Sequence, residues 1–107
     1  MPDVMSVESI ARLSLPEAYR LLLTLAQDDP SALGLRHKGQ IRFGFDYHFD
    51  LWLAMNSNYV VDQKNGTVMI GPSTLRLTTF YTEIEKRDAL IRRLLIRGLV
   101  GKDPFTR

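Results

Sequence analysis

Three side chains able to bind a divalent metal ion alternate within residues 42–54. Asp46, His48 and Asp50 are two positions apart, and in a β-strand such side chains project from one face about 7 Å from each other. Carboxylate and imidazole groups are ligands that divalent ions accept. No fourth ligand is identifiable from the spacing, and the polar face of an antiparallel sheet also explains the pattern. A metal-dependent enzyme is therefore our third hypothesis, and we assign no metal site.

Other residue patterns typical of catalysis are missing from the sequence. There is no cysteine, no HExxH motif, no nucleophile elbow around a serine, and no glycine-rich phosphate loop. His37 lies in a predicted loop, where an imidazole alone indicates no role. We expect no enzymatic activity and no cofactor. The absence of cysteine also favours a reducing compartment, so we expect the protein in the cytoplasm.

Basic side chains gather near the end of the chain. On a helix predicted over residues 83–97, Lys86, Arg93 and Arg97 fall on one side, and Lys102 extends the group. Residues 83–107 hold seven basic and four acidic residues, whereas residues 1–35 hold two basic and five acidic ones. These bases could contact nucleic-acid phosphates or form an ordinary solvated face near a helix C-terminus. Nucleic-acid binding is the alternative function.

A helix predicted over residues 15–27 carries more apolar surface than one packed face needs. Its apolar residues span about 200° of the helical wheel, whereas a surface helix usually shows a stripe of about 100° or somewhat more. The surplus must meet the second long helix, the 6–13 segment or another chain. Trp52 falls on the polar face of the predicted strand, where it is either covered or offered to a partner. The predicted partner-binding residues are Tyr19, Leu21, Leu25 and Trp52.

The elements that would position these residues can be read from periodicity and capping signals. Ser14 with Glu17, and Thr82 with Glu85, have the spacing of capping boxes, and Gly98 is a helix stop. Phe43, Phe45, Tyr47, Phe49, Leu51 and Leu53 alternate with polar residues, which predicts a half-buried strand. The predicted order is a short helix at 6–13, the helix at 15–27, strands at 42–54, 59–62, 67–70 and 75–78, and the helix at 83–97.

These elements predict an α+β fold with a terminal helix on each side of a central antiparallel sheet of three to four strands. Asn65–Gly66 suits a two-residue type I′ turn, so we expect an Asn-Gly hairpin between the strands at 59–62 and 67–70. We expect both long helices to cover the Phe43/Phe45/Tyr47/Phe49 face. The length of 107 residues indicates one domain, residues 1–107, with 101–107 as a loose tail.

Composition is that of a globular protein, with 45% apolar and 24% charged residues. The apolar runs, such as Leu21–Leu23, are too short for a signal peptide or a membrane span, so we expect neither and no membrane partner.

Two fragments, residues 14–22 and 90–100, are similar to winged-helix regulators of the multiple-antibiotic-resistance type. The similarity covers about a fifth of the chain. In that family the wing hairpin follows such a basic helix, whereas the predicted hairpin precedes it here, so we assign the chain to no family. The leading hypothesis is a non-enzymatic, protein-binding regulatory module of bacterial or phage origin, such as an inhibitor, anti-activator or adaptor. Its partner would be another protein, with a homodimer as the second outcome.

Overall fold

The computed structural model describes residues 5–41, 47–55 and 58–104. Within these residues, four α-helices surround the core together with a three-stranded antiparallel sheet, so the predicted α+β class is confirmed. The elements in chain order are α1 (Val7–Arg12), α2 (Leu15–Asp28), η1 (Pro30–Leu33, a 3-10 helix), α3 (Tyr47–Met55), β1 (Val60–Asp62), β2 (Thr67–Ile70), β3 (Ser73–Arg76), α4 (Leu77–Leu95) and η2 (Ile96–Val100, a π-helix).

The N-terminal helices follow their local capping signals. Ser6 caps α1, and Ser14 caps α2 with the predicted capping box. The Ser14 hydroxyl accepts from the Glu17 amide at 3.3 Å, and the Glu17 carboxylate accepts from the Ser14 amide at 2.9 Å. The hydrogen bond from the Ser14 backbone, followed by that with its side chain, lowers the pKa of Glu17. Short-range hydrogen bonds therefore explain why the start of α2 was predictable.

The C-terminal helix was predicted wrongly at both ends. It begins at Leu77 rather than at residue 83, and its N-cap residue Arg76 makes no side-chain capping bond. The helix starts earlier because Phe80, upstream of Thr82, packs in the core. It lies on the same helix face as the buried Arg87, Ile91 and Leu95. Gly98 does not stop the helix either, since the chain continues through η2 to a left-handed Gly101.

The sheet has the order β1-β2-β3, with both pairs antiparallel. Asp62 pairs with Thr67, so four residues join β1 to β2 and the two-residue turn at Asn65–Gly66 is not found. The Asp62 carboxylate accepts a hydrogen bond from the Asn65 side chain at 2.6 Å and another from the Asn65 backbone N–H at 3.2 Å. The side-chain bond, followed by the backbone bond, lowers the pKa of Asp62, and both hold the wider loop. The further strand predicted at 75–78 is confirmed only for residues 75–76, which end β3, because residues 77–78 already belong to α4.

The strand predicted at 42–54 is the main error. Residues 47–55 form α3, and residues 42–46, including Phe43 and Phe45, lie outside the described residues. Phe49, Trp52 and Leu53 are buried together, which is the three- and four-residue spacing of a helix. The alternation that suggested a strand also fits a short helix with apolar residues on every side, and tertiary packing decides between the two.

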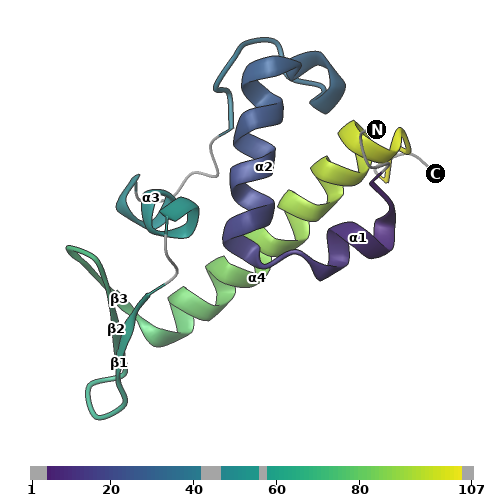
Figure 1. The fold of residues 1–107 in the computed structure, drawn as a ribbon. Helices are drawn as coiled ribbons and strands as arrows, with labels where there is room; N and C mark the ends of the chain where they lie inside the picture. Colours follow the sequence, from purple (N-terminus) through teal and green to yellow (C-terminus); the bar gives the residue numbers. More distant parts are fainter. Residues whose placement is uncertain (1–4, 42–46, 56–57, 105–107) are drawn as a thin grey trace.

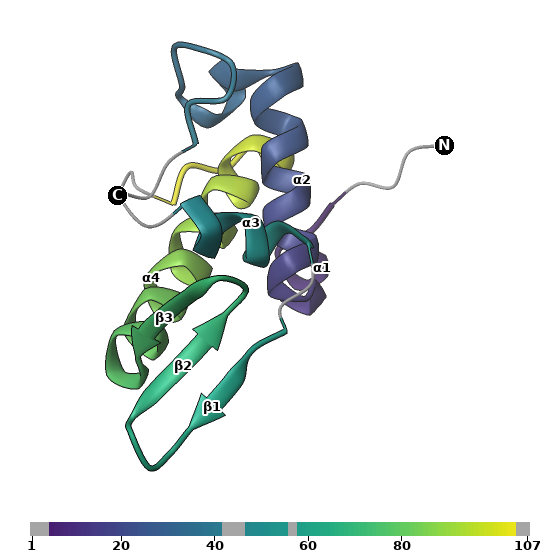
Figure 2. The ribbon, with the colours of Figure 1, turned by 90° about the vertical axis from the view of Figure 1, so that its left-hand side faces the viewer.

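The elements form an elongated body of 48 × 31 × 28 Å. In Figure 1, α2 crosses the long α4, α1 also packs against α4, and the sheet lies at one end beside the first turns of α4. Figure 2 shows α3 between the helical part and the sheet. The sheet is thus central in the sequence but peripheral in space. Among the described residues, no helix combines the length and apolar character that crossing a bilayer requires.

Arg92 ties the two ends of the described chain together. From α4 its guanidinium donates to the backbone carbonyls of Ile10 and Leu13 at the end of α1, the latter at 3.0 Å. Its Nε also donates to Asp88 at 2.7 Å. The Ile10 carbonyl also accepts from the Leu13 backbone N–H at 3.2 Å, so Arg92 adds a second bond there and a further one at the C-cap residue Leu13.

We expect Arg92→Ala to lower the free energy of unfolding by about 1.5–3 kcal/mol, the range for hydrogen bonds from a charged group. Urea denaturation followed by circular dichroism measures this loss. The control Lys102→Ala, at an exposed position, should change stability by no more than about 0.5 kcal/mol. An Arg92→Ala variant as stable as the control would show that this link is unimportant.

Candidate functional site

The most exposed apolar surface on a helix of the described chain lies on α3. Tyr47, Leu51 and Met55 follow each other at four-residue spacing, and 67%, 42% and 65% of their surfaces are exposed. We call these three residues the outer strip. The opposite side of the helix carries the buried Phe49, Trp52 and Leu53. Apart from His48 and Asp50, every residue of α3 is apolar or aromatic, so the helix has apolar residues both inside and outside.

Arg87 fixes the rotational orientation of α3 about the helix axis. Its side chain, which is 1% exposed, reaches from α4 to Asp50 of α3, with both its Nε and one terminal nitrogen 2.9 Å from Oδ1. The other terminal nitrogen lies 2.7 Å from Glu83. The guanidinium carbon also lies 4.5 Å from the centre of the Phe49 ring. Paired carboxylates and an aromatic face compensate the buried cation.

The end of α3 is fixed to α2. Arg20 donates to the Ala54 carbonyl at 2.9 Å and to the Met55 carbonyl at 3.5 Å. These acceptors belong to the last turn of α3, whose carbonyls lack partners within the helix, and a cation there is also favoured by the helix dipole. Arg20 and Arg87 thus hold α3 from two different helices.

Beneath α3, aromatic rings connect the helix to α4 and to the segment just before β1. The Trp52 ring centre lies 5.2 Å from that of Phe49, 5.8 Å from that of Phe80 and 6.1 Å from that of Tyr59. Tilted and edge-to-face pairs at such distances are favourable beyond simple burial. This packing buries the inner side of α3, opposite the outer strip.

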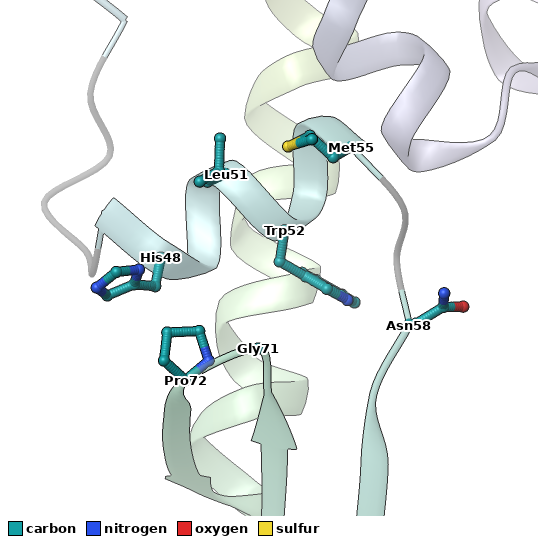
Figure 3. Close-up of a pocket in the computed structure, with 7 residues that line it drawn as sticks. All are labelled: His48, Leu51, Trp52, Met55, Asn58, Gly71 and Pro72. Carbon is teal, nitrogen blue, oxygen red and sulfur yellow. The ribbon is translucent and has the colours of Figure 1, made fainter.

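A hollow of about 270 Å³ opens on one side of Leu51. We call it the Trp52 hollow. In Figure 3, residues of α3 face the Gly71–Pro72 turn between β2 and β3, and Asn58 stands at the start of the segment leading to β1. Its lining residues are His48, Leu51, Trp52, Met55, Asn58, Gly71 and Pro72. The larger part of this wall is apolar.

A second hollow of about 210 Å³ lies on the other side of Leu51, between α3 and α2. We call it the Tyr19 hollow. Its lining residues are Tyr19, Leu23, Gly39, Ile41, Tyr47, Asp50, Leu51 and Ala54. Leu51 lines both hollows and forms a ridge between them. Both volumes are below the ~300 Å³ at which pockets for drug-sized ligands begin, and they correspond better to single side chains.

The four predicted partner-binding residues have different surroundings. Tyr19 and Trp52 are buried and each lines one of the two hollows. Leu21 and Leu25 are half-buried and pack against the core. Leu25 reaches Gly98, where a Cβ atom would lie only 2.7 Å from its Cδ2. The surplus apolar surface of α2 is thus used largely inside the fold, and the prediction that Trp52 lies on a polar strand face is wrong.

Only part of the predicted basic group is exposed. Lys86, Arg93 and Lys102 are exposed, with Lys86 lying 3.7 Å from Glu83. Arg97 packs beside Gly34 and lies 3.9 Å from Asp103. Two further bases of α4, Arg87 and Arg92, point into the fold.

The Asp46, His48 and Asp50 group does not form the predicted row on a strand. Asp46 lies outside the described residues, and His48 and Asp50 are two positions apart on a helix, where such residues do not face the same way. Asp50 bonds Arg87. Among residues 5–41, 47–55 and 58–104, no three side chains of metal-binding type come together.

The outer strip itself was missed by sequence reasoning. Tyr47 and Leu51 were assigned to the buried strand face, and Met55 was assigned no role. The signal that could have found them is the four-residue spacing of Tyr47, Leu51 and Met55 beside the helical spacing of Phe49, Trp52 and Leu53.

No family model matches this chain. Comparison with curated proteins and with solved structures also finds no match. The site must therefore be interpreted from its own geometry.

We expect Arg87→Met to lower the free energy of unfolding by roughly 2–3 kcal/mol. This is less than the 3–5 kcal/mol typical for breaking a fully buried pair, because the carboxylates of Asp50 and Glu83 are about one-fifth exposed. Chemical denaturation measures the loss, and amide exchange should show that α3 is the element loosened most. Lys86→Met, at an exposed site on the same helix, is the control. Equal stability of the two variants would contradict the role given to Arg87.

Proposed function

We propose that this chain is a non-enzymatic regulatory module that binds another protein through the outer strip of α3. The observation that carries the proposal is that a helix with apolar residues on all sides lies at the surface. Such helices are normally enclosed, whereas Tyr47, Leu51 and Met55 are exposed here. A partner that covers the outer strip would bury the apolar side chains of α3 that the fold itself leaves exposed.

The chemistry of the surface favours a neutral, apolar segment as the occupant. Asp50 is the one carboxylate among the residues lining the two hollows, and Arg87 already compensates it. The hollows flank Leu51 and are of side-chain size, so a docked segment can place one apolar residue on each side of this ridge. A helix docking by spaced apolar anchors is a common mode of peptide recognition.

The mode of action that we propose is occupation of a partner's surface, as in a small inhibitor, anti-activator or adaptor. Two basic residues, Arg20 and Arg87, hold α3 in place without a ligand, so the position of the helix is set before the partner arrives, which reduces the ordering cost of binding. A cytoplasmic location is part of the proposal and is supported by the lack of cysteine.

We expect Leu51→Lys to reduce recovery of a co-purifying protein by at least about 30-fold, the equivalent of losing a hot spot of about 2 kcal/mol. The substitution places a charge on the ridge between the hollows. The measurement is affinity purification of the tagged chain from its native host, with the bound protein quantified by mass spectrometry.

The matched control is Met69→Lys, which removes an apolar side chain that is 55% exposed on the sheet and should leave recovery unchanged. Light scattering of the purified chain tests a second copy as the occupant, because a dimer that Leu51→Lys dissociates would make this chain its own partner. Equal recovery with Leu51→Lys and Met69→Lys, or no stoichiometric protein bound to the wild-type chain, would contradict the proposal.

A further inference from the structure

Trp52 carries a buried hydrogen-bond donor with no acceptor. It is the single tryptophan of the chain and is 6% exposed. Its indole nitrogen Nε1 is covered and donates to no acceptor among the described residues. Buried polar groups are nearly always paired, because an unpaired donor has lost its bonds to water without replacement. A rare exception of this kind calls for a physical explanation.

The unpaired donor belongs to a residue that lines the Trp52 hollow. In Figure 3 the nitrogen end of the indole lies on the side of Asn58, whose side chain points away from it. Leu51, Met55 and Pro72 provide apolar walls around the same space. A largely apolar hollow with an unpaired donor in its wall is complementary to a group that joins an apolar body to a hydrogen-bond acceptor.

We infer that the Trp52 hollow receives one apolar residue of the docked protein segment, and that Trp52 Nε1 donates a hydrogen bond to an oxygen atom of that residue. The inference rests on the proposed protein-binding function and specifies what the partner presents. A backbone carbonyl next to an apolar side chain has the required chemistry. Because Nε1 is covered in the free chain, the wall beside it moves slightly when the oxygen enters.

This arrangement gives the site selectivity as well as affinity. Apolar contacts with Leu51 and Met55 discriminate weakly between side chains of similar size, whereas an oxygen that pairs Nε1 adds a hydrogen bond that a ligand without an acceptor does not form. The Tyr19 hollow contributes apolar contact on the other side of Leu51. The Trp52 hollow is therefore the one that fixes the register of the docked segment.

The test is a titration of the isotopically labelled chain with N-acetyl-leucine N-methylamide, which carries an apolar side chain and two carbonyl oxygens. One tryptophan gives one indole Nε1–H resonance, so this signal can be assigned without ambiguity. We expect its proton resonance to move downfield and saturate, together with the resonances of Leu51, Met55 and Gly71. N-acetylglycine N-methylamide offers the same carbonyls without the side chain and should shift none of them.

Trp52→Phe provides a second arm, because it keeps an aromatic ring and removes the donor. We expect a 2- to 12-fold weaker affinity for the leucine probe, as loss of one neutral hydrogen bond implies. If this variant does not fold, the comparison of the two probes on the wild-type chain still decides. An indole resonance unmoved by the leucine probe, or an equal response to the glycine probe, would overturn the inference.

The two proposals fail in different ways. If Leu51→Lys abolishes recovery of the partner while the leucine probe leaves the indole unmoved, the outer strip binds protein but the Trp52 hollow does not take the acceptor. If the probe binds as expected and no protein is recovered, the hollow accepts the predicted group and the protein-binding function is wrong.

Discussion

A charged side chain enclosed within the fold decides which part of this protein faces solvent. Burying the Arg87 guanidinium is unfavourable unless carboxylates compensate it, so Asp50 must face α4. This requirement fixes the rotation of α3, and Arg20 fixes its end by bonding the carbonyls of the last turn. With Phe49, Trp52 and Leu53 directed inward, the outer strip of Tyr47, Leu51 and Met55 is left on the surface. The exposed strip is a consequence of the internal ion pair.

The functional proposal follows from the composition of α3 together with this orientation. A short helix that is apolar on every side cannot hide all of its surface against one neighbouring layer. The aromatic packing of Trp52 with Phe49, Phe80 and Tyr59 uses one side, and the two hollows beside Leu51 shape the other. The unpaired Nε1 of Trp52 then indicates what the missing neighbour contributes, namely an oxygen acceptor attached to an apolar residue.

The parts of this structure that depend on short-range bonds were predictable from the sequence, and the parts that depend on distant contacts were not. The capping box at Ser14 sets the start of α2 locally. The start of α4 depends on Phe80 packing against Phe49 of α3 and against Tyr59, just before β1, which outweighs the capping potential of Thr82. For residues 47–54, apolar alternation fits a strand and a helix equally well, so the exposed and buried sides were confused. The Trp52 hollow needs the Gly71–Pro72 turn opposite α3, a proximity that no local pattern contains.

Methionine oxidation tests the central claim most directly, because the chain carries its own internal comparison. Met55 on the outer strip and Met69 on the sheet are both exposed in the free protein, by 65% and 55%, so peroxide should oxidise both at similar rates. Mild oxidation of the complex with the recovered partner, followed by peptide mass spectrometry, reports which thioether is covered. The structure predicts that Met55 becomes protected while Met69 remains reactive. Protection of Met69 alone, or unchanged oxidation of Met55, would contradict the assignment of the outer strip as the docking surface.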